Sequence, residues 1–144
     1  MTLRMGAALA SLAGVFVSAY LWLFKLGKIG ELTCGTGGCV TVQLSPHSRS
    51  FGIEVAAVGF VGYVVLLGLT LLSLQPRWLS SVGLMRLIMA LATGAVLFTA
   101  WLKYLEFFVI GAVCQWCMVS AALIVLFFVL VVLELRRMGR APAA

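Results

Sequence analysis

The four cysteines of this 144-residue chain fall into two close pairs. Cys34 and Cys39 lie in a Gly-rich polar stretch, and Cys114 and Cys117 open the last long apolar run. Thiols spaced this closely can form disulfides and exchange them. In a sequence this apolar, the arrangement points to dithiol–disulfide electron transfer at a membrane surface.

The second pair forms the motif Cys114-Gln-Trp-Cys117 at the predicted start of a helix. At that position the first thiol lies near the positive end of the helix dipole, which favours thiolate and therefore exchange. Apolar sequence without charges follows for about 16 residues, most of a membrane span. Two other interpretations of the motif stay open, namely half of a zinc site and two inert buried cysteines.

The first pair, Cys34-Gly-Thr-Gly-Gly-Cys39, encloses three glycines among its four intervening residues. Glycine gives the backbone freedom to close the ring as a disulfide, to open it and to move one cysteine elsewhere. A structural disulfide in a short outward loop is the alternative. A zinc site built from all four cysteines fits poorly, because structural zinc sites lie in closed scaffolds, and we expect no metal.

Four apolar blocks must position these cysteines. Residues of apolar type make up 64% of the chain, against roughly half in a soluble globular domain. Each block is about 18 to 21 residues long, which matches a hydrocarbon core of about 30 Å. The sequence predicts an all-α integral membrane protein: one domain over residues 1–144, a four-transmembrane-helix bundle with one long outward loop (about 27–54) between helices 1 and 2. The expected spans are about 7–24, 55–74, 82–102 and 114–133.

The first block is interpreted as a span rather than as a cleaved signal peptide. Its apolar run exceeds a typical signal-peptide core of roughly 7 to 15 residues, and no clear small-residue cleavage site follows it. Four small residues recur four apart on one face and should let another helix approach closely. They are Gly6, Ala10, Gly14 and Ser18.

The basic residues predict which end of the bundle faces the cytoplasm. Six arginines go with the termini, and four basic residues flank the other ends of the spans, where glutamates dilute them. By the positive-inside tendency we expect cytoplasmic termini and both cysteine pairs outside, in an oxidising compartment. The net charge of +6 then reflects topology and headgroup contact, and no aromatic-basic stretch indicates nucleic acid. The six are Arg4, Arg77, Arg86, Arg136, Arg137 and Arg140, and the four are Lys25, Lys28, Arg49 and Lys103.

The remaining connections are short. Residues 75–81 predict a tight turn that contains proline, and residues 103–113 are expected to link the third and fourth spans. Within that link, Lys103 and Glu106 are three apart and are interpreted as an interfacial helix pair. His47, a lone loop histidine, is interpreted as a solvated surface residue.

The order of features along the chain is distinctive. Residues 39–52 and residues 104–117 carry it most clearly, because both the residue types and their spacing match a known pattern. The matching features are four spans, a loop cysteine pair, Ser45, Phe51-Gly52, Gly59 and Tyr63 in the second span, and C-x-x-C at the fourth. Together they resemble the vitamin K epoxide reductase family over essentially the whole chain.

The resemblance implies a role for each cysteine. Cys34 would exchange with the reduced dithiol of a partner, and Cys39 would then attack Cys114. That transfer leaves Cys117, one helical turn deeper, as the thiolate that faces a bound quinone. Each step but the last is thiol–disulfide exchange through a mixed disulfide.

The resemblance also implies a pocket for a quinone of the ubiquinone or menaquinone class. Val55 and Ala121 match positions where the vertebrate enzymes place an Asn and a Tyr around the vitamin K head group. This departure favours quinone-coupled disulfide formation over epoxide reduction. The residues expected at the pocket are Ser45, Val55, Tyr63, Ile110 and Trp116. The match also places Glu106 near this pocket.

We therefore expect a quinone-dependent thiol oxidoreductase of a bacterial inner membrane, with its redox cysteines facing the periplasm or exterior. It would reoxidise a thioredoxin-fold partner supplied by a separate chain, and so drive disulfide formation in secreted proteins; membrane lipid is the other expected partner. Alternatives are a vitamin K epoxide or quinone reductase and a non-enzymatic membrane protein with two structural disulfides. The disulfide-bond-formation protein B family is a further alternative, but its C-x-x-C lies in the first outer loop.

Overall fold

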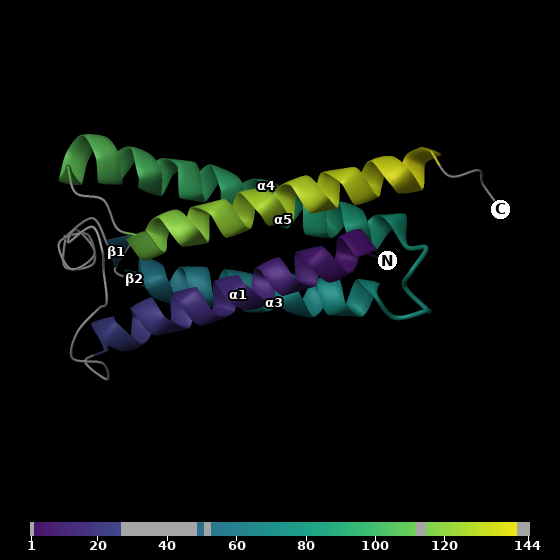
Figure 1. Cartoon of the computed structure of the whole chain (residues 1–144), viewed down its shortest axis with the longest axis horizontal. Coiled ribbons are helices and arrows are strands. Elements are labelled where there is room, and N and C mark those ends of the chain that lie inside the picture. The colour runs from purple at the N-terminus through teal and green to yellow at the C-terminus, as the bar shows by residue number, and fades with distance from the viewer. Residues whose placement is uncertain (1, 27–48, 51–52, 112–114, 141–144) are drawn as a thin grey trace.

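The computed structural model describes residues 2–26, 49–50, 53–111 and 115–140. Four long helices lie along one another (Figure 1). The helices are α1 (Thr2–Lys25), α3 (Val55–Ser73), α4 (Val82–Tyr104) and α5 (Gln115–Arg140). A π-helical segment, η2 (Leu105–Ile110), continues α4, and the strands β1 (Arg49–Ser50) and β2 (Ile53–Glu54) precede α3.

All four helices are long and apolar enough to cross a bilayer. The shortest candidate span has 19 residues, which at 1.5 Å per residue approaches the hydrocarbon thickness of about 30 Å. This confirms the predicted helical fold with four membrane spans. The helices extend beyond the apolar blocks, from Thr2 at one terminus to Arg140 at the other, because backbone hydrogen bonding continues past the last apolar residue.

The helices alternate in direction, so the bundle has two distinct ends (Figure 1). One end, which we call the terminal end, contains the start of α1, the turn between α3 and α4, and the end of α5. The opposite end of the bundle contains the end of α1, the start of α3, η2 and the start of α5. We call this the cysteine end, because Cys117 lies in the first turn of α5 there.

The link predicted over residues 103–113 is largely helical, so the third span extends beyond the predicted 82–102. α4 runs to Tyr104 and η2 continues to Ile110, so the third candidate span is Val82–Val109. No residue in this stretch breaks a helix until Gly111. That glycine adopts a left-handed conformation with φ of 72°, and its N–H donates to the carbonyl of Glu106 at 3.0 Å.

The loop predicted over residues 27–54 lies mostly outside the described residues. The part that is described contains β1 and β2, which the sequence analysis did not predict. They pair antiparallel, with Ser50 opposite Ile53 and Arg49 opposite Glu54. This short ladder leads directly into α3.

The turn between α3 and α4 lies where the sequence predicted it. Ser81 caps α4, since its side-chain oxygen accepts a hydrogen bond from the N–H of Leu84 at 3.2 Å. The carbonyl of Trp78 accepts from the N–H of Ser81 at 3.0 Å. These bonds satisfy backbone groups that α4 would otherwise leave unpaired at its start.

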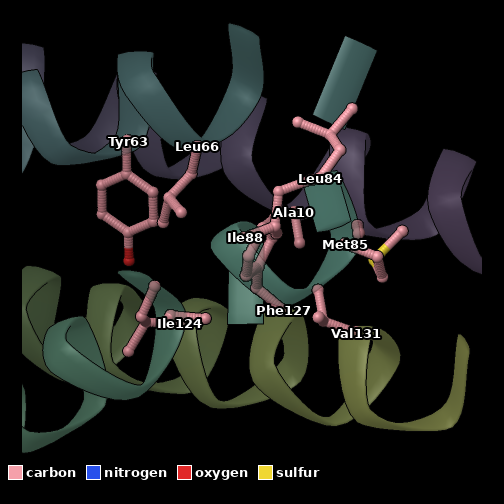
Figure 2. Packing of buried hydrophobic residues seen from close by; sticks show 11 residues of the cluster. Ala10, Tyr63, Leu66, Leu84, Met85, Ile88, Ile124, Phe127 and Val131 are labelled. Carbon is pink, nitrogen blue, oxygen red and sulfur yellow. The ribbon is translucent and has the colours of Figure 1, made fainter. Parts of the chain in front are cut away.

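The core lies between the helices and extends toward the terminal end. Figure 2 shows Ile88 of α4 between Leu66 of α3 and Phe127 of α5. Small residues of α1 allow close approach, as predicted: a Cβ on Gly6 would lie 3.3 Å from the side chain of Leu130. Since lipid is as apolar as these side chains, close packing rather than exclusion of water holds the helices together.

A buried arginine joins the elements at the terminal end. Arg4 is only 4% exposed, and its Nε donates to Glu134 Oε1 at 2.8 Å. Its two terminal nitrogens donate to the carbonyls of Ser73 at 2.6 Å and Leu79 at 2.7 Å. The sequence analysis counted Arg4 as a flanking charge, but the side chain points into the bundle. It links α1, the end of α3, the following turn and α5.

Replacing Arg4 by Met should destabilise the bundle by about 3–5 kcal/mol, because Glu134 would remain buried without its cation. The double variant Arg4→Met/Glu134→Met should recover most of that loss, since it removes both charges. Unfolding in detergent micelles, followed by circular dichroism, measures the effect. A double variant as unstable as Arg4→Met alone would show that the ion pair is not the cause.

Candidate active site

Cys117 is the described member of the two cysteine pairs. It is half-buried in the first turn of α5, at the cysteine end of the bundle. The N–H groups of a first helical turn have no partner within the helix and favour negative charge nearby. Cys34, Cys39 and Cys114 lie outside the described residues, so their pairing and their roles stay predictions.

A cavity of about 360 Å³ lies beside Cys117. All four long helices and η2 contribute to its wall, which is mostly apolar, and the cavity is partly open. Its size and lining fall within the usual range for sites that bind small molecules. The side chains of Leu21, Phe98, Leu102 and Ile124 are among those that line it.

Tyr63 crosses from α3 toward α5 at this cavity (Figure 2). Its hydroxyl donates to the carbonyl of Ser120 at 2.7 Å and lies 3.1 Å from the Ser120 hydroxyl. Ser120 also lines the cavity and follows Cys117 by one helical turn. The ring is 6% exposed because Gly14 of α1 leaves room for it: a Cβ on Gly14 would lie 2.2 Å from a ring carbon.

Small residues form the wall between α3 and α4. Gly59 and Gly62 of α3 and Gly94 and Ala95 of α4 all line the cavity. A Cβ placed on Gly62 or Gly94 would meet no atom within 4 Å. Gly62 and Gly94 are also exposed on the bundle surface. Because these residues have no side chain or only a methyl group, the cavity wall is thin on the face that meets lipid.

An ion pair lies on the cavity wall formed by α4 and η2. Lys103 Nζ lies 2.5 Å from Glu106 Oε2, and the two side chains are 17% and 3% exposed. From the sequence the pair was interpreted as interfacial, although the family resemblance placed Glu106 near a quinone pocket. Both residues line the cavity instead, together with Thr99, one turn earlier on α4.

The chain was compared with known protein families. The profile described as the vitamin K epoxide reductase family matches residues 6–132. The chain belongs to this family. The matched stretch includes both cysteine pairs and the residues around the cavity, so the resemblance drawn from the sequence is confirmed.

Membership of the vitamin K epoxide reductase family, together with the four candidate spans, makes this chain a multi-pass membrane protein of an oxidoreductase family. Proteins of this family act with quinones. The cavity beside Cys117 lies within the membrane-spanning part of the bundle, where a lipid-soluble quinone would be available. In the part of the chain that the structure describes, one cysteine of the C-x-x-C motif therefore lines a mostly apolar cavity.

The structure brings together some of the residues predicted for a quinone pocket. Val55 and Tyr63 line the cavity, and Ala121 lines it as well. Trp116 packs against Tyr20 of α1, with ring centroids 5.2 Å apart. Ile110 is the last residue of η2, and Ser45 lies outside the described residues.

The sequence analysis missed most of the cavity wall contributed by α4. A signal was present: Thr99, Lys103 and Glu106 are polar residues spaced by four and three in an otherwise apolar run, which places them on one helical face. The glycines of α3 and α4 gave no such signal. Glycine in a membrane helix serves packing as often as it borders a cavity.

Gly14→Ala should displace the Tyr63 ring and destabilise the protein by about 1–3 kcal/mol, because the new methyl group would overlap that ring. Gly68→Ala in α3 is a matched control, since its Cβ would meet no atom within 4 Å. Thermal unfolding of both variants in the same detergent measures the difference. Equal unfolding temperatures would mean that the ring does not depend on Gly14.

Proposed function

We propose that this protein is a quinone-dependent thiol oxidoreductase that reoxidises a thioredoxin-fold partner and so drives disulfide formation in secreted proteins. The observation that supports this most directly is the position of Cys117 on the wall of a largely apolar, partly open cavity within the membrane. A cysteine of a C-x-x-C motif at such a cavity can pass electrons to an acceptor dissolved in lipid. Family membership supports the same class of chemistry.

The cavity suits a quinone ring. Its walls are mainly aliphatic and aromatic, and its volume of about 360 Å³ exceeds that of a single aromatic ring. The hydroxyls of Tyr63 and Ser120 lie at the same cavity and provide polar groups near a quinone oxygen. The thin wall at Gly62 and Gly94 lies on the lipid face, where a quinone tail would extend.

A bound quinone would supply the oxidising power, and the protein would supply proximity and a dry site. In the proposed relay, the partner's dithiol reduces the Cys34–Cys39 disulfide by exchange. Cys39 then attacks the Cys114–Cys117 disulfide, which re-forms the loop disulfide and leaves Cys114 and Cys117 reduced. Oxidation of these two thiols back to a disulfide releases two electrons and two protons, the number that converts one quinone to one quinol.

We place the cysteine end outside the cytoplasm, at the outer face of a bacterial inner membrane. Arginines concentrate at the terminal end, where Arg77 lies in the turn before α4, Arg86 in the first part of α4, and Arg136 and Arg137 near the end of α5. Positive charge in short loops favours the cytoplasmic side. This orientation gives the partner access to the thiols from an oxidising compartment.

Epoxide reduction is the less favoured activity for this cavity. Val55 and Ala121 both line it, and neither side chain can donate or accept a hydrogen bond. Opening an epoxide would need oriented donors at the reacting oxygen. A quinone ring needs only contact with Cys117 and two protons.

The purified wild-type protein should reduce ubiquinone-1 or menadione when given a reduced thioredoxin-fold protein, and should turn over vitamin K epoxide weakly or not at all. Cys117→Ala should abolish quinone reduction, because the thiol that faces the cavity is gone. Quinone absorbance measures turnover, and Met118→Ala, next to Cys117 but not lining the cavity, is the control. Efficient epoxide turnover, or quinone turnover in Cys117→Ala, would refute the assignment.

The relay order predicts a trapped intermediate. In the double variant Cys34→Ala/Cys117→Ala, a Cys39–Cys114 disulfide should accumulate, because the thiols that would resolve it are absent. Peptide mass spectrometry after thiol alkylation detects this bond. If only free thiols are found at Cys39 and Cys114 under oxidising conditions, the two pairs do not exchange and the proposed electron path is wrong.

A further inference from the structure

The Lys103–Glu106 ion pair is unusual in its location. Glu106 is 3% exposed, and both residues lie within the candidate span Val82–Val109. Charged residues inside a membrane span are costly, and they mark functional sites more often than structural ones. The pair also spans the change from α4, which contains Lys103, to the π-helical turns of η2, which contain Glu106, and irregularities of this kind are frequent at functional sites.

The Lys103–Glu106 bond is local to one stretch of helix. Lys103 and Glu106 are three residues apart on one continuous helical segment, so their bond joins no separate elements. Such local pairs add little to the stability of exposed helices, less than the cost of removing two charges from water. The Arg4–Glu134 pair differs, because it joins α1 to α5 and also binds the backbone of the turn after α3.

The pair is placed where protons would be needed. Among the described residues that line the cavity, Lys103 and Glu106 are the charged ones. Cys117 and Ser120 of α5 line the same cavity. Conversion of a quinone to a quinol adds one proton to each of two oxygens, and a mainly apolar cavity holds few groups that can deliver them.

Resting on the proposed function, we propose that Lys103 is a proton donor to the quinone oxygen, and that Glu106 positions its ammonium group. As the Cys114 and Cys117 thiols form their disulfide, two electrons reach the quinone. One of its O–H bonds forms with a proton from the Lys103 ammonium and the other with a proton from a thiol. The second thiol proton restores the ammonium through Glu106. Two thiol hydrogens are thereby transferred to one quinone, and Lys103 is unchanged overall.

Four variants test this role in the full-length protein in detergent: Lys103→Arg, Lys103→Met, Glu106→Gln and Lys103→Met/Glu106→Gln. Reduced thioredoxin-fold protein and ubiquinone-1 are the substrates. Lys103→Met and the double variant should lower kcat about 100-fold with little change in KM, the usual effect of losing a general acid. Lys103→Arg should also be slow, because a guanidinium keeps the charge but does not give up a proton. Arg86→Met, an exposed arginine in the first part of α4, is the control.

Two further measurements do not depend on turnover. Ubiquinone-1 binding to the oxidised protein, measured by quenching of tryptophan fluorescence, should have the same Kd in wild type and Lys103→Arg. Thermal unfolding should show Lys103→Met destabilised, because buried Glu106 loses the Lys103 charge, and the double variant restored. If the double variant regains stability but keeps a low kcat, proton donation is separated from a structural role. The double variant also keeps the test valid if Lys103→Met does not fold.

Several results would overturn the inference. Wild-type kcat in the double variant would show that the pair only maintains structure, and wild-type kcat in Lys103→Arg would show that charge alone suffices. A weakened Kd that accounts for the whole loss in Lys103→Arg would assign the residue to binding. If the wild-type protein reduces no quinone, the proposed function itself fails; if it does and the variants match it, only the role of Lys103 fails.

Discussion

The contact between Tyr63 and Gly14 determines how the helices around the cavity are arranged. The ring lies directly against the backbone of α1, and its hydroxyl reaches the backbone of α5 at Ser120. One side chain thus connects three helices at the level of the cavity. In lipid, helices gain little from burying aliphatic surface, so close contacts of this kind and their hydrogen bonds determine the packing. Ser120, which accepts the hydroxyl's hydrogen bond, lies one helical turn after Cys117 on α5.

The two ends of the bundle differ in a way that fits a redox membrane protein. At the terminal end, Arg4 closes the structure by binding Glu134 and two backbone carbonyls, and the residues around it leave little empty space. At the cysteine end, small residues on α3 and α4 leave a cavity open toward lipid. A rigid terminal end can hold the helices while the other end admits a ligand. The same sequence therefore combines stability at one end with a binding site at the other.

The polar groups of the cavity belong to two separate sets. Tyr63 and Ser120 connect α3 to α5 and are satisfied by each other. Lys103 and Glu106 belong to the other wall and contribute charge rather than a link between helices. In the proposed reaction the first set would help to orient a quinone and the second would handle a proton. Both sets remain inside a lining that is otherwise mainly apolar, where such interactions are stronger than in water.

Hydrophobic block length was enough to predict four spans and a helical fold, because a bilayer imposes both a minimum length and a fully hydrogen-bonded backbone. The helix boundaries were less predictable: η2 continues past Lys103 because helix ends depend on caps and breakers, here Gly111, rather than on hydropathy. The small-residue stripe of α1 predicted close packing but not its partner, which is the Tyr63 ring at Gly14 and Leu130 at Gly6.

The sequence by itself determined the class of protein, the C-x-x-C motif at the start of the last span and the resemblance to the vitamin K epoxide reductase family. All three features depend only on composition and on spacing along the chain. Only the tertiary structure decided that Arg4 points into the bundle, that the glycines of α3 and α4 border a cavity beside Cys117, and that Lys103 lines this cavity together with Glu106. The physical reason is that a helix fixes which residues share a face, whereas the neighbour of that face depends on how helices distant in sequence pack.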